Sequence, residues 1–340
     1  MDPGLLKAIR QGNRDRIKRL AKEKPDFFTK RIPQGNTVLH ISARLATGNN
    51  YVIDILIHPR KWDDLHGLTK IFTTVEVLRM HDIEGNTPLH IAVRNGHFEV
   101  VRNILSNESR LLQCRNEAGK SPLSITIEAS LAVIAQYIYD TSLDCLLKEK
   151  FSLVYERDNH GQTPLHLTAK NGRLNILKML VNDYPDASEV FDHRQCNILH
   201  LAAEFGHAKM VSYLLNLPEI KDFVNSSDVD GNNPLHLAAM HFISDVVYIL
   251  SKNKKVNIRV TNNKLKTALE IAHESPENPK RAIQKAQTEM FLHLTIKALK
   301  AAYANQALDP EDILENLRFS GILMGDIDDK GAKKWLKLCP

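Results

Sequence analysis

Histidine, cysteine and carboxylate side chains are the groups in this sequence that could bind a metal ion or act in catalysis. The 340 residues include fifteen histidines and four widely spaced cysteines, Cys114, Cys145, Cys196 and Cys339. No two cysteines form a C-x-x-C pair, so their spacing indicates neither a zinc site nor a disulfide framework. Glu270 and His273 have the spacing of a carboxylate–histidine metal motif, but the pair occurs once and has no second pair to complete it.

Five of the histidines occupy the same position of a recurring phrase, G-x-T-P-L-H. They are His40, His90, His166, His200 and His236. If each phrase begins a helix, neighbouring histidines stand about 10 Å apart, the usual separation of packed helices. Metal–histidine bonds are about 2 Å long, so these side chains are too far apart to share an ion. We therefore expect the five histidines to be structural, and we expect no metal site and no cofactor.

Known catalytic signatures are missing from the sequence. It contains no GxxxxGK[ST] phosphate loop, no GxSxG elbow and no kinase motif. Basic residues gather at both ends, with ten Lys/Arg against four Asp/Glu in residues 1–31 and eleven against four in residues 252–300. No aromatic platform or reading motif accompanies them, so we expect no nucleic-acid partner. The prediction is a protein that is not an enzyme.

The phrase itself shows that the chain is built from repeats. Its leucines, or their equivalents, are Leu5, Leu39, Leu89, Leu123, Leu165, Leu199, Leu235 and Leu269. The separation of 34 residues recurs four times among these seven intervals, and the other three intervals are longer. A fixed period with occasional insertions is typical of a repeat array.

Each repeat predicts a turn followed by two short helices. Gly85 permits the positive φ of a tight turn, Thr87 can cap the following helix, and Pro88 suits its first turn. Gly96 predicts the end of this helix in a left-handed conformation. Residues 98–105 then carry apolar side chains at spacings of three and four, which predicts a second helix. One such unit cannot bury its apolar face alone, so stacked units must share a core.

This pattern resembles the ankyrin repeat, whose signature is close to T-P-L-H-x-A. The resemblance implies an all-α ankyrin-repeat solenoid of helix-turn-helix units with β-turn or hairpin loops over residues 1–275. We expect an N-terminal cap, about six repeats and a degenerate last unit. Residues 281–304 have helical periodicity and predict a helix that caps the stack, and residues 305–340 predict a weakly ordered tail.

A closer resemblance is carried by the opening MDPGLLKAIRQGN and by GNTPLHIAVRNGH, GQTPLHLTAKNGR and NILHLAAEFGHAKMVSYLL. These segments are similar to plant ankyrin proteins of the accelerated-cell-death type. That family implies defence and stress signalling, at the cytosolic face of the plasma membrane, through a C-terminal membrane domain with a Pro-Gly-Gly signature. The present sequence lacks that signature, so we expect membrane contact only through such a missing domain or through a weak basic surface. The alternative is a cytoplasmic, truncated relative or decoy regulator without membrane attachment.

Two insertions interrupt the period. Residues 57–80 lengthen one interval and could form either a binding loop or a loop that packs on the stack. Residues 140–153 lengthen another and predict an extended helix. The third repeat has Ser124 in place of histidine and lacks the second turn glycine.

The functional prediction is a scaffold or adaptor, monomeric as given, that binds a protein or peptide on its concave surface. Ankyrin proteins resemble one another in using the turn tips and the ends of the inner helices for this purpose. On this sequence the candidate partner-binding residues are Asp82, Glu84, Asn86, Arg94, Asn95, Asp158, His160, Lys170, Asn171, Glu204, Phe205, Asp228, Asp230, Met240 and His241. Several tip residues are acidic, which favours a basic partner. Phe205 and Met240 are apolar where small or polar residues are expected, so they are candidates for a binding hot spot or for packing between repeats.

Overall fold

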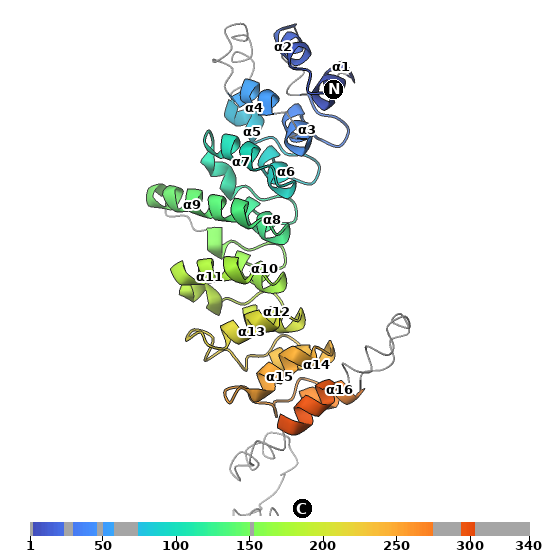
Figure 1. Cartoon of the computed structure of the whole chain (residues 1–340), viewed down its shortest axis with the longest axis vertical. Coiled ribbons are helices and arrows are strands. Elements are labelled where there is room, and N and C mark those ends of the chain that lie inside the picture. Colours follow the sequence, from blue (N-terminus) through green and yellow to red (C-terminus); the bar gives the residue numbers. More distant parts are fainter. Residues whose placement is uncertain are drawn as a thin grey trace, which may run out of the picture.

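The fold is a stack of helix pairs. The computed structural model describes residues 3–23, 30–45, 50–57, 74–149, 153–274 and 294–302, and these residues contain helices and turns but no β-strand. The predicted all-α solenoid is confirmed over these ranges. Figure 1 shows the pairs following one another from the N-terminal α1 to the C-terminal α16.

The helices form two parallel layers. Each inner helix contacts the inner helices of the neighbouring repeats, and those from α1 to α14 also contact the outer helix of their own repeat. The inner layer comprises α1 (Pro3–Arg10), α3 (Val38–Leu45), α6 (Pro88–Arg94), α8 (Pro122–Glu128), α10 (Pro164–Lys170), α12 (Ile198–Glu204), α14 (Pro234–Met240) and α16 (Ala268–Glu274). The outer layer comprises α2 (Arg14–Glu23), α4 (Asn50–Ile57), α7 (Phe98–Leu105), α9 (Ala132–Glu149), α11 (Leu174–Asp183), α13 (Ala208–Leu214) and α15 (Ser244–Lys252).

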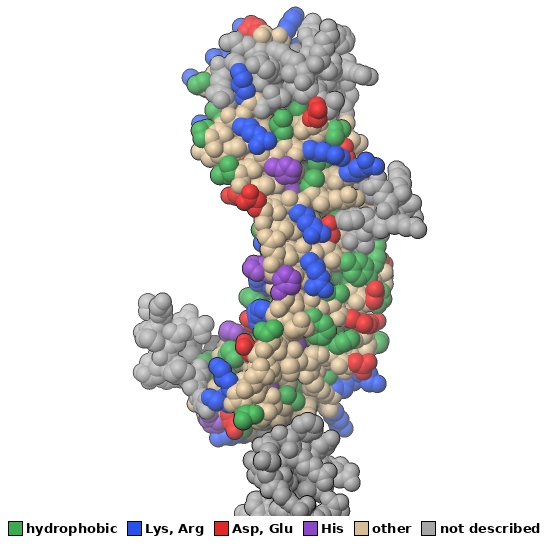
Figure 2. All heavy atoms as spheres, turned by 180° about the vertical axis from the view of Figure 1, so that it is seen from behind, with side chains coloured by type: hydrophobic (Ala, Val, Ile, Leu, Met, Phe, Trp, Pro, Cys, Tyr) green, Lys and Arg blue, Asp and Glu red, His purple; other side chains and the backbone are tan. Residues whose placement is uncertain are grey.

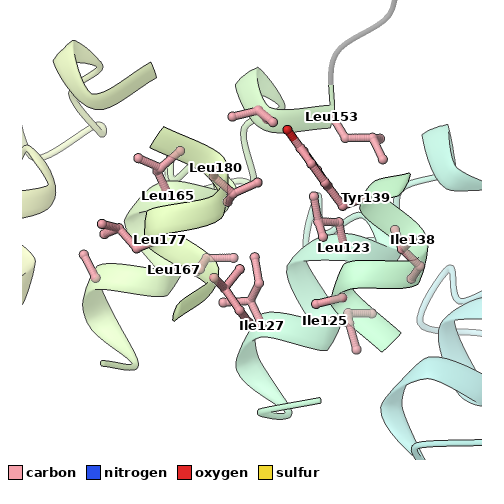
Figure 3. Close-up of a cluster of buried hydrophobic side chains, with 14 of the residues drawn as sticks. Leu123, Ile125, Ile127, Ile138, Tyr139, Leu153, Leu165, Leu167, Leu177 and Leu180 are labelled. Carbon is pink, nitrogen blue, oxygen red and sulfur yellow. The ribbon is translucent and has the colours of Figure 1, made fainter. Parts of the chain in front are cut away.

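One continuous apolar core lies between the layers. It runs from Leu5 in α1 to Ala272 in α16, and it is filled mainly by leucine, isoleucine and valine. Figure 3 shows how consecutive repeats share it, with Leu123 of α8 and Leu165 of α10 among the buried side chains. Because each repeat covers the apolar face of the next, no single repeat is a folding unit on its own.

The turns before α6, α8, α10, α12, α14 and α16 are each closed by an aspartate or asparagine. In every case the side-chain Oδ1 accepts hydrogen bonds from the backbone N–H groups two and four residues later, at 2.8–3.1 Å. The six residues are Asp82, Asn116, Asp158, Asp192, Asp228 and Asn262. The shape of each turn is therefore set by hydrogen bonds within the turn itself.

Successive turns are also joined to one another through their backbones. The N–H of Glu117 donates to the carbonyl of Glu84 at 2.9 Å, and the N–H of His193 donates to the carbonyl of His160 at 3.1 Å. Equivalent bonds join Ile83 to Gln34, Asn159 to Ala118, Val229 to Arg194 and Asn263 to Asp230. The turns therefore form a ladder along one side of the stack, and this ladder fixes the spacing of their side chains.

The insertions differ in how they fit the stack. The helix predicted around residues 140–153 exists, because α9 continues to Glu149 and is 18 residues long. Within the 57–80 insertion, α5 (Thr74–Leu78) buries Val77 and Leu78 against the core. The rest of that insertion, residues 58–73, lies outside the described residues.

At the C-terminal end, residues 294–302 form a helix whose Thr295, Leu299 and Ala302 are buried. Leu299 and Ala302 belong to the same core as the repeats. Residues 275–293, which include the first part of the predicted capping helix at 281–304, and residues 303–340, which include the predicted tail at 305–340, lie outside the described residues.

Glycine and a non-glycine residue hold the same turn position in two neighbouring repeats, so exchanging each of them tests how the turn conformation affects stability. Gly161 has a φ of +75°, and a Cβ built on it would lie 2.8 Å from the backbone nitrogen of His193. Gln195 holds the same turn position one repeat later with a φ of +58°. A left-handed conformation costs an L-residue about 1–2 kcal/mol.

We therefore expect Gly161→Ala to lower the free energy of unfolding by at least about 1–2 kcal/mol. Gln195→Gly is expected to raise it by about 0.5–1 kcal/mol, because relief of the strain exceeds the entropic cost of glycine. Urea titrations followed by circular dichroism measure both changes. Equal effects of the two substitutions would show that the turn conformation is not what sets their stability.

Candidate partner-binding surface

The turns and the C-terminal ends of the inner helices lie on one side of the molecule. Figure 2 shows the stack bending so that the side carrying the inner helices is hollowed. All fifteen residues predicted to bind a partner lie on these turns or at these helix ends. The structure therefore gathers them on one elongated face, but their side chains have different roles.

Four of the predicted tip residues belong to the framework of the turns. Asp158 is only 6% exposed and Asp228 only 7%, because their Oδ1 atoms accept backbone hydrogen bonds inside their own turns. Asp82 makes the same bonds and is half-buried. Asn86 is fully buried and accepts a hydrogen bond at 3.0 Å from Asn116 of the next repeat. This corrects the expectation that Asn86, Asp158 and Asp228 face a partner.

Two further candidates are helix caps. The side-chain amide of Asn95 donates to the carbonyl of Ile91 at 2.8 Å, and that of Asn171 donates to the carbonyl of Leu167 at the same distance. Both residues follow the last residue of an inner helix, and their side-chain amides add a second hydrogen bond to a carbonyl that already accepts from their own backbone N–H. Their first role is therefore to terminate α6 and α10.

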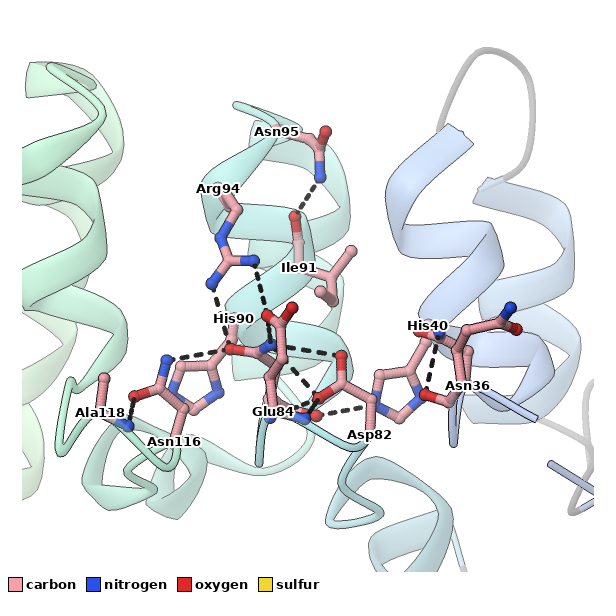
Figure 4. A network of polar contacts seen from close by, with 12 residues as sticks. Asn36, His40, Asp82, Glu84, His90, Ile91, Arg94, Asn95, Asn116 and Ala118 are labelled. Atoms are coloured by element: carbon pink, nitrogen blue, oxygen red, sulfur yellow. Dashed lines mark hydrogen bonds and ion pairs between the residues drawn. The ribbon is translucent and has the colours of Figure 1, made fainter. Parts of the chain in front are cut away.

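The five recurring histidines lie beneath this surface and join neighbouring repeats. In the repeats that begin with threonine, the histidine Nδ1 accepts from the threonine N–H and hydroxyl, as at Thr87 and His90 with 3.1 and 2.8 Å. Nε2 then carries the proton and donates to a backbone carbonyl of the next repeat. For His90 that acceptor is Lys120, at 3.2 Å, and for His40 it is Asn86, at 2.8 Å. Figure 4 shows these two histidines beneath the turn network.

Burial keeps these imidazoles neutral. Desolvation lowers the pKa of His90 to about 4 and the pKa of His200 to about 4. Desolvation is also the largest cause of the lowered pKa of His40, His166 and His236. A charged imidazole would have to be buried against backbone groups, which is costly. The histidines thus support the surface and have no exposed atoms with which to perform chemistry.

Ion pairs join the turns to the helix ends in three repeats. Arg94 lies 3.4 Å from Glu84, Lys120 lies 2.6 Å from Glu128, and Arg194 lies 3.2 Å from Glu204. The first two pairs line a shallow hollow of about 490 Å³ between the second and third repeats. Lys120, Glu128 and Arg194 were not among the predicted residues. The opposite charges of each pair stand eight or ten residues apart within one repeat and can be read from the sequence, whereas the distance between the two side chains cannot.

The remaining candidates are accessible. His160, Asp230 and His241 are exposed, and Phe205 and Met240 are 45% and 40% exposed. Lys170 is half-buried, and its Nζ lies 5.5 Å from the centre of the Phe205 ring. These side chains, together with Glu84 and Arg94, are the groups that a partner can reach.

The array of turn, inner helix, glycine turn and outer helix defines a repeat solenoid. A family model described as ankyrin repeats, three copies, matches residues 5–113, 64–149, 131–224 and 199–283. Because these matches cover more than half of the sequence, the chain belongs to the ankyrin-repeat family.

Curated relatives share the repeats and differ in the rest of their length. The chain is 28% identical over 251 residues to the NF-kappa-B inhibitor zeta of Mus musculus, covering 65% of the chain and 32% of that protein. It is 26% identical over 180 residues to the target of rapamycin complex 2 subunit AVO2 of Saccharomyces cerevisiae, covering 53% and 37%. It is 31% identical over 204 residues to the human transient receptor potential cation channel subfamily A member 1, covering 58% and 17%. The chain thus spans well under half the length of each.

The residues that the structure describes contain neither a membrane-spanning helix nor a metal-binding cluster. Among these residues, no helix combines the length and the apolar character needed to cross a bilayer. The same residues contain no group of three or more histidine, cysteine or acidic side chains placed to hold a metal ion. Glu270, considered above as a metal ligand, instead accepts from the N–H and hydroxyl of Thr267, at 2.7 and 2.8 Å. That contact caps α16.

Proposed function

We propose that the chain is a non-catalytic scaffold or adaptor whose hollowed face binds a segment of another protein. The observation that carries this proposal is the row of accessible side chains on that face, held in register by the turn ladder and the histidine bonds beneath it. A rigid surface loses little conformational entropy on binding, so its contacts contribute fully to affinity.

The names of the relatives support a regulatory role of this kind. One is an inhibitor by name, and another is by name a subunit of target of rapamycin complex 2. The segments that resemble the accelerated-cell-death family favour plant defence or stress signalling as the setting, with action at the cytosolic face of the plasma membrane. A regulator or decoy that works without membrane attachment is the alternative. Fractionation of the native protein separates them, because a membrane pool that resists high salt contradicts the unattached form.

A capture experiment with paired surface variants tests the binding face. The inner-face variant carries His160→Glu and Lys170→Glu, on the turn and helix end of the fourth repeat, and Asp230→Lys, on the turn of the sixth repeat. The outer-face variant carries Tyr248→Ala and Lys252→Glu on α15, where Tyr248 is 56% exposed. We expect the inner-face variant to retain less than about a tenth of the captured partner, equivalent to a loss of about 1.4 kcal/mol.

The outer-face variant is expected to capture the partner as the unchanged chain does. Asp158 is excluded from the design, because a lysine there would disrupt its turn and unfold the repeat. Circular dichroism of both variants serves as the control for correct folding. Normal capture by the inner-face variant, with loss in the outer-face variant, would place the interface on the outer helices and contradict the proposal.

A further inference from the structure

Most charges on the inner face are neutralised within their own repeat. The pairs Glu84–Arg94, Lys120–Glu128 and Arg194–Glu204 each join a turn to a helix end. A partner would have to break these pairs or leave them intact, so they contribute little net charge to recognition. Any charge selectivity must therefore come from groups that have no such partner.

Lys170 is such a group. It ends α10, and among the described residues no carboxylate oxygen lies within the 4.0 Å that defines an ion pair with its ammonium. Its ammonium makes a cation–π contact with the ring of Phe205, whose centre lies 5.5 Å from Nζ. The equivalent positions of the third and fifth repeats are Glu128 and Glu204, which are paired. The fourth repeat thus presents a cation that nothing in its own turn neutralises.

An exposed apolar surface adjoins this cation. Phe205 follows the last residue of α12, and Met240 is the last residue of α14. Helices α10, α12 and α14 pack side by side in that order, so Lys170, Phe205 and Met240 lie at the same end of three neighbouring helices. We call these three residues the Lys170 patch. Apolar side chains of this size that remain 40–45% exposed still have apolar area to bury against a partner.

Three turn carboxylates in this region are buried. Asp158, Asp192 and Asp228 are 2–7% exposed and accept backbone hydrogen bonds within their turns. Asp230 is the exposed acidic residue of the sixth turn, and exposed Lys264 occupies the next turn. The acidic tips therefore do not outweigh Lys170. This reverses the charge preference predicted from the sequence, which was for a basic partner.

We propose that the Lys170 patch binds an acidic and apolar peptide segment, in which a leucine- or phenylalanine-type side chain stands within a few residues of a carboxylate. The apolar side chain covers Phe205 and Met240, and the carboxylate pairs with Lys170. As the apolar side chain excludes water, the pairing of the two charges becomes stronger than at an open surface. The proposal rests on the inner face being the binding face, and it adds the repeats used and the chemistry of the partner.

The test is selection from a library of random peptides displayed on phage, with the whole chain as the bait. Each selected peptide is then synthesised and titrated, by fluorescence anisotropy, against three proteins. These are the unchanged chain, a patch variant (Lys170→Glu, Phe205→Ala, Met240→Ala) and the outer-face variant. The outer-face variant is a matched control, because Lys252 and Tyr248 form the same kind of cation–ring pair, with Nζ 5.8 Å from the ring centre.

We expect the selected peptides to be enriched in Asp or Glu close to Leu, Ile, Met or Phe. Their affinity should fall at least about tenfold in the patch variant and stay within about twofold in the outer-face variant. Lys170→Glu alone should weaken the acidic peptides and strengthen copies in which each acidic residue is replaced by lysine. That reversal distinguishes a charge contact from a loss of folding.

Two results overturn the inference while the proposed function stands. The first is selection of basic peptides that lose affinity in the patch variant, and the second is peptides that bind the inner face with no dependence on the patch. Peptides that depend only on Tyr248 or Lys252 overturn the proposed function itself. A selection that yields no binder from the library counts against the patch as a peptide site.

Discussion

Acidification from about pH 7 to about pH 5 is expected to lower the stability of the fold sharply. The five buried histidines have pKa values below the ordinary 6.5, and those of His90 and His200 fall to about 4. Between pH 6.5 and the lowered pKa, the unfolded chain binds protons that the folded chain does not, so stability falls as the pH falls. His90 and His200 each contribute up to about 1.4 kcal/mol per pH unit within this window, and His40, His166 and His236 lower the stability in the same direction.

Other titrating groups change this expectation little in that range. Burial raises the pKa of Glu156, which stabilises the folded chain on acidification and opposes one histidine at most. Hydrogen bonds to Thr267 lower the pKa of Glu270, an effect that matters only near and below pH 4.5. Urea titrations at a series of pH values measure the result. A midpoint that is constant between about pH 7 and pH 5 would show that the histidines are not buried as neutral groups.

Replacing one recurring histidine with leucine is expected to cost about 2–4 kcal/mol of unfolding free energy. His166 is the best choice, because it is fully buried in the middle of the stack. Its Nδ1 accepts from the N–H and hydroxyl of Thr163, at 3.2 and 2.8 Å, and its Nε2 donates to the carbonyl of Cys196 at 3.1 Å. Leucine fills the space but leaves the Thr163 N–H unsatisfied and removes the bond to the next repeat.

Ser124 supplies the matched control at the same repeat position. Its hydroxyl lies 3.3 Å from that of Ser121, and among the described residues it has no hydrogen bond to the next repeat. That junction is instead spanned by Arg115, which lies 3.2 Å from the buried Glu156 and donates to the carbonyl of Arg157 at 3.1 Å. Ser124→Ala is therefore expected to cost less than about 1 kcal/mol. Equal losses in the two variants, measured by urea titration, would show that the inter-repeat bond contributes nothing.

The solenoid could be predicted from the sequence because the turn residues of the repeat have strong conformational preferences. Gly85, Pro88 and Leu89 each favour one backbone state or one environment, and the same three types recur together in the phrases that begin at Gly119, Gly161 and Gly231. The left-handed turns at Gln195, Leu265 and Phe242 were harder to predict, because non-glycine residues rarely adopt them. There the surrounding stack imposes the conformation that the neighbouring glycines adopt without strain.

The candidate surface could be predicted by position but not by accessibility. Repeat alignment placed Asp158 and Asp230 on turns, yet only Asp230 is exposed. The two differ because the first residue of each turn directs its carboxylate inward to the backbone N–H groups, as Asp228 does in the turn of Asp230. The pairing of Arg194 with Glu204 likewise depends on the distance between a turn and a helix end, which a repeat pattern does not specify.

The central claim is that a partner segment lies on the inner face of the repeats, and site-specific photo-crosslinking tests it most directly. A photoreactive phenylalanine analogue is placed singly at His160, Asp230 and His241 on the inner face, and at Val133 and Tyr248, which are exposed on outer helices. We predict that the captured partner crosslinks to all or most of the inner-face positions and to neither outer position. Crosslinks from Val133 or Tyr248, with none from the inner face, would contradict the account.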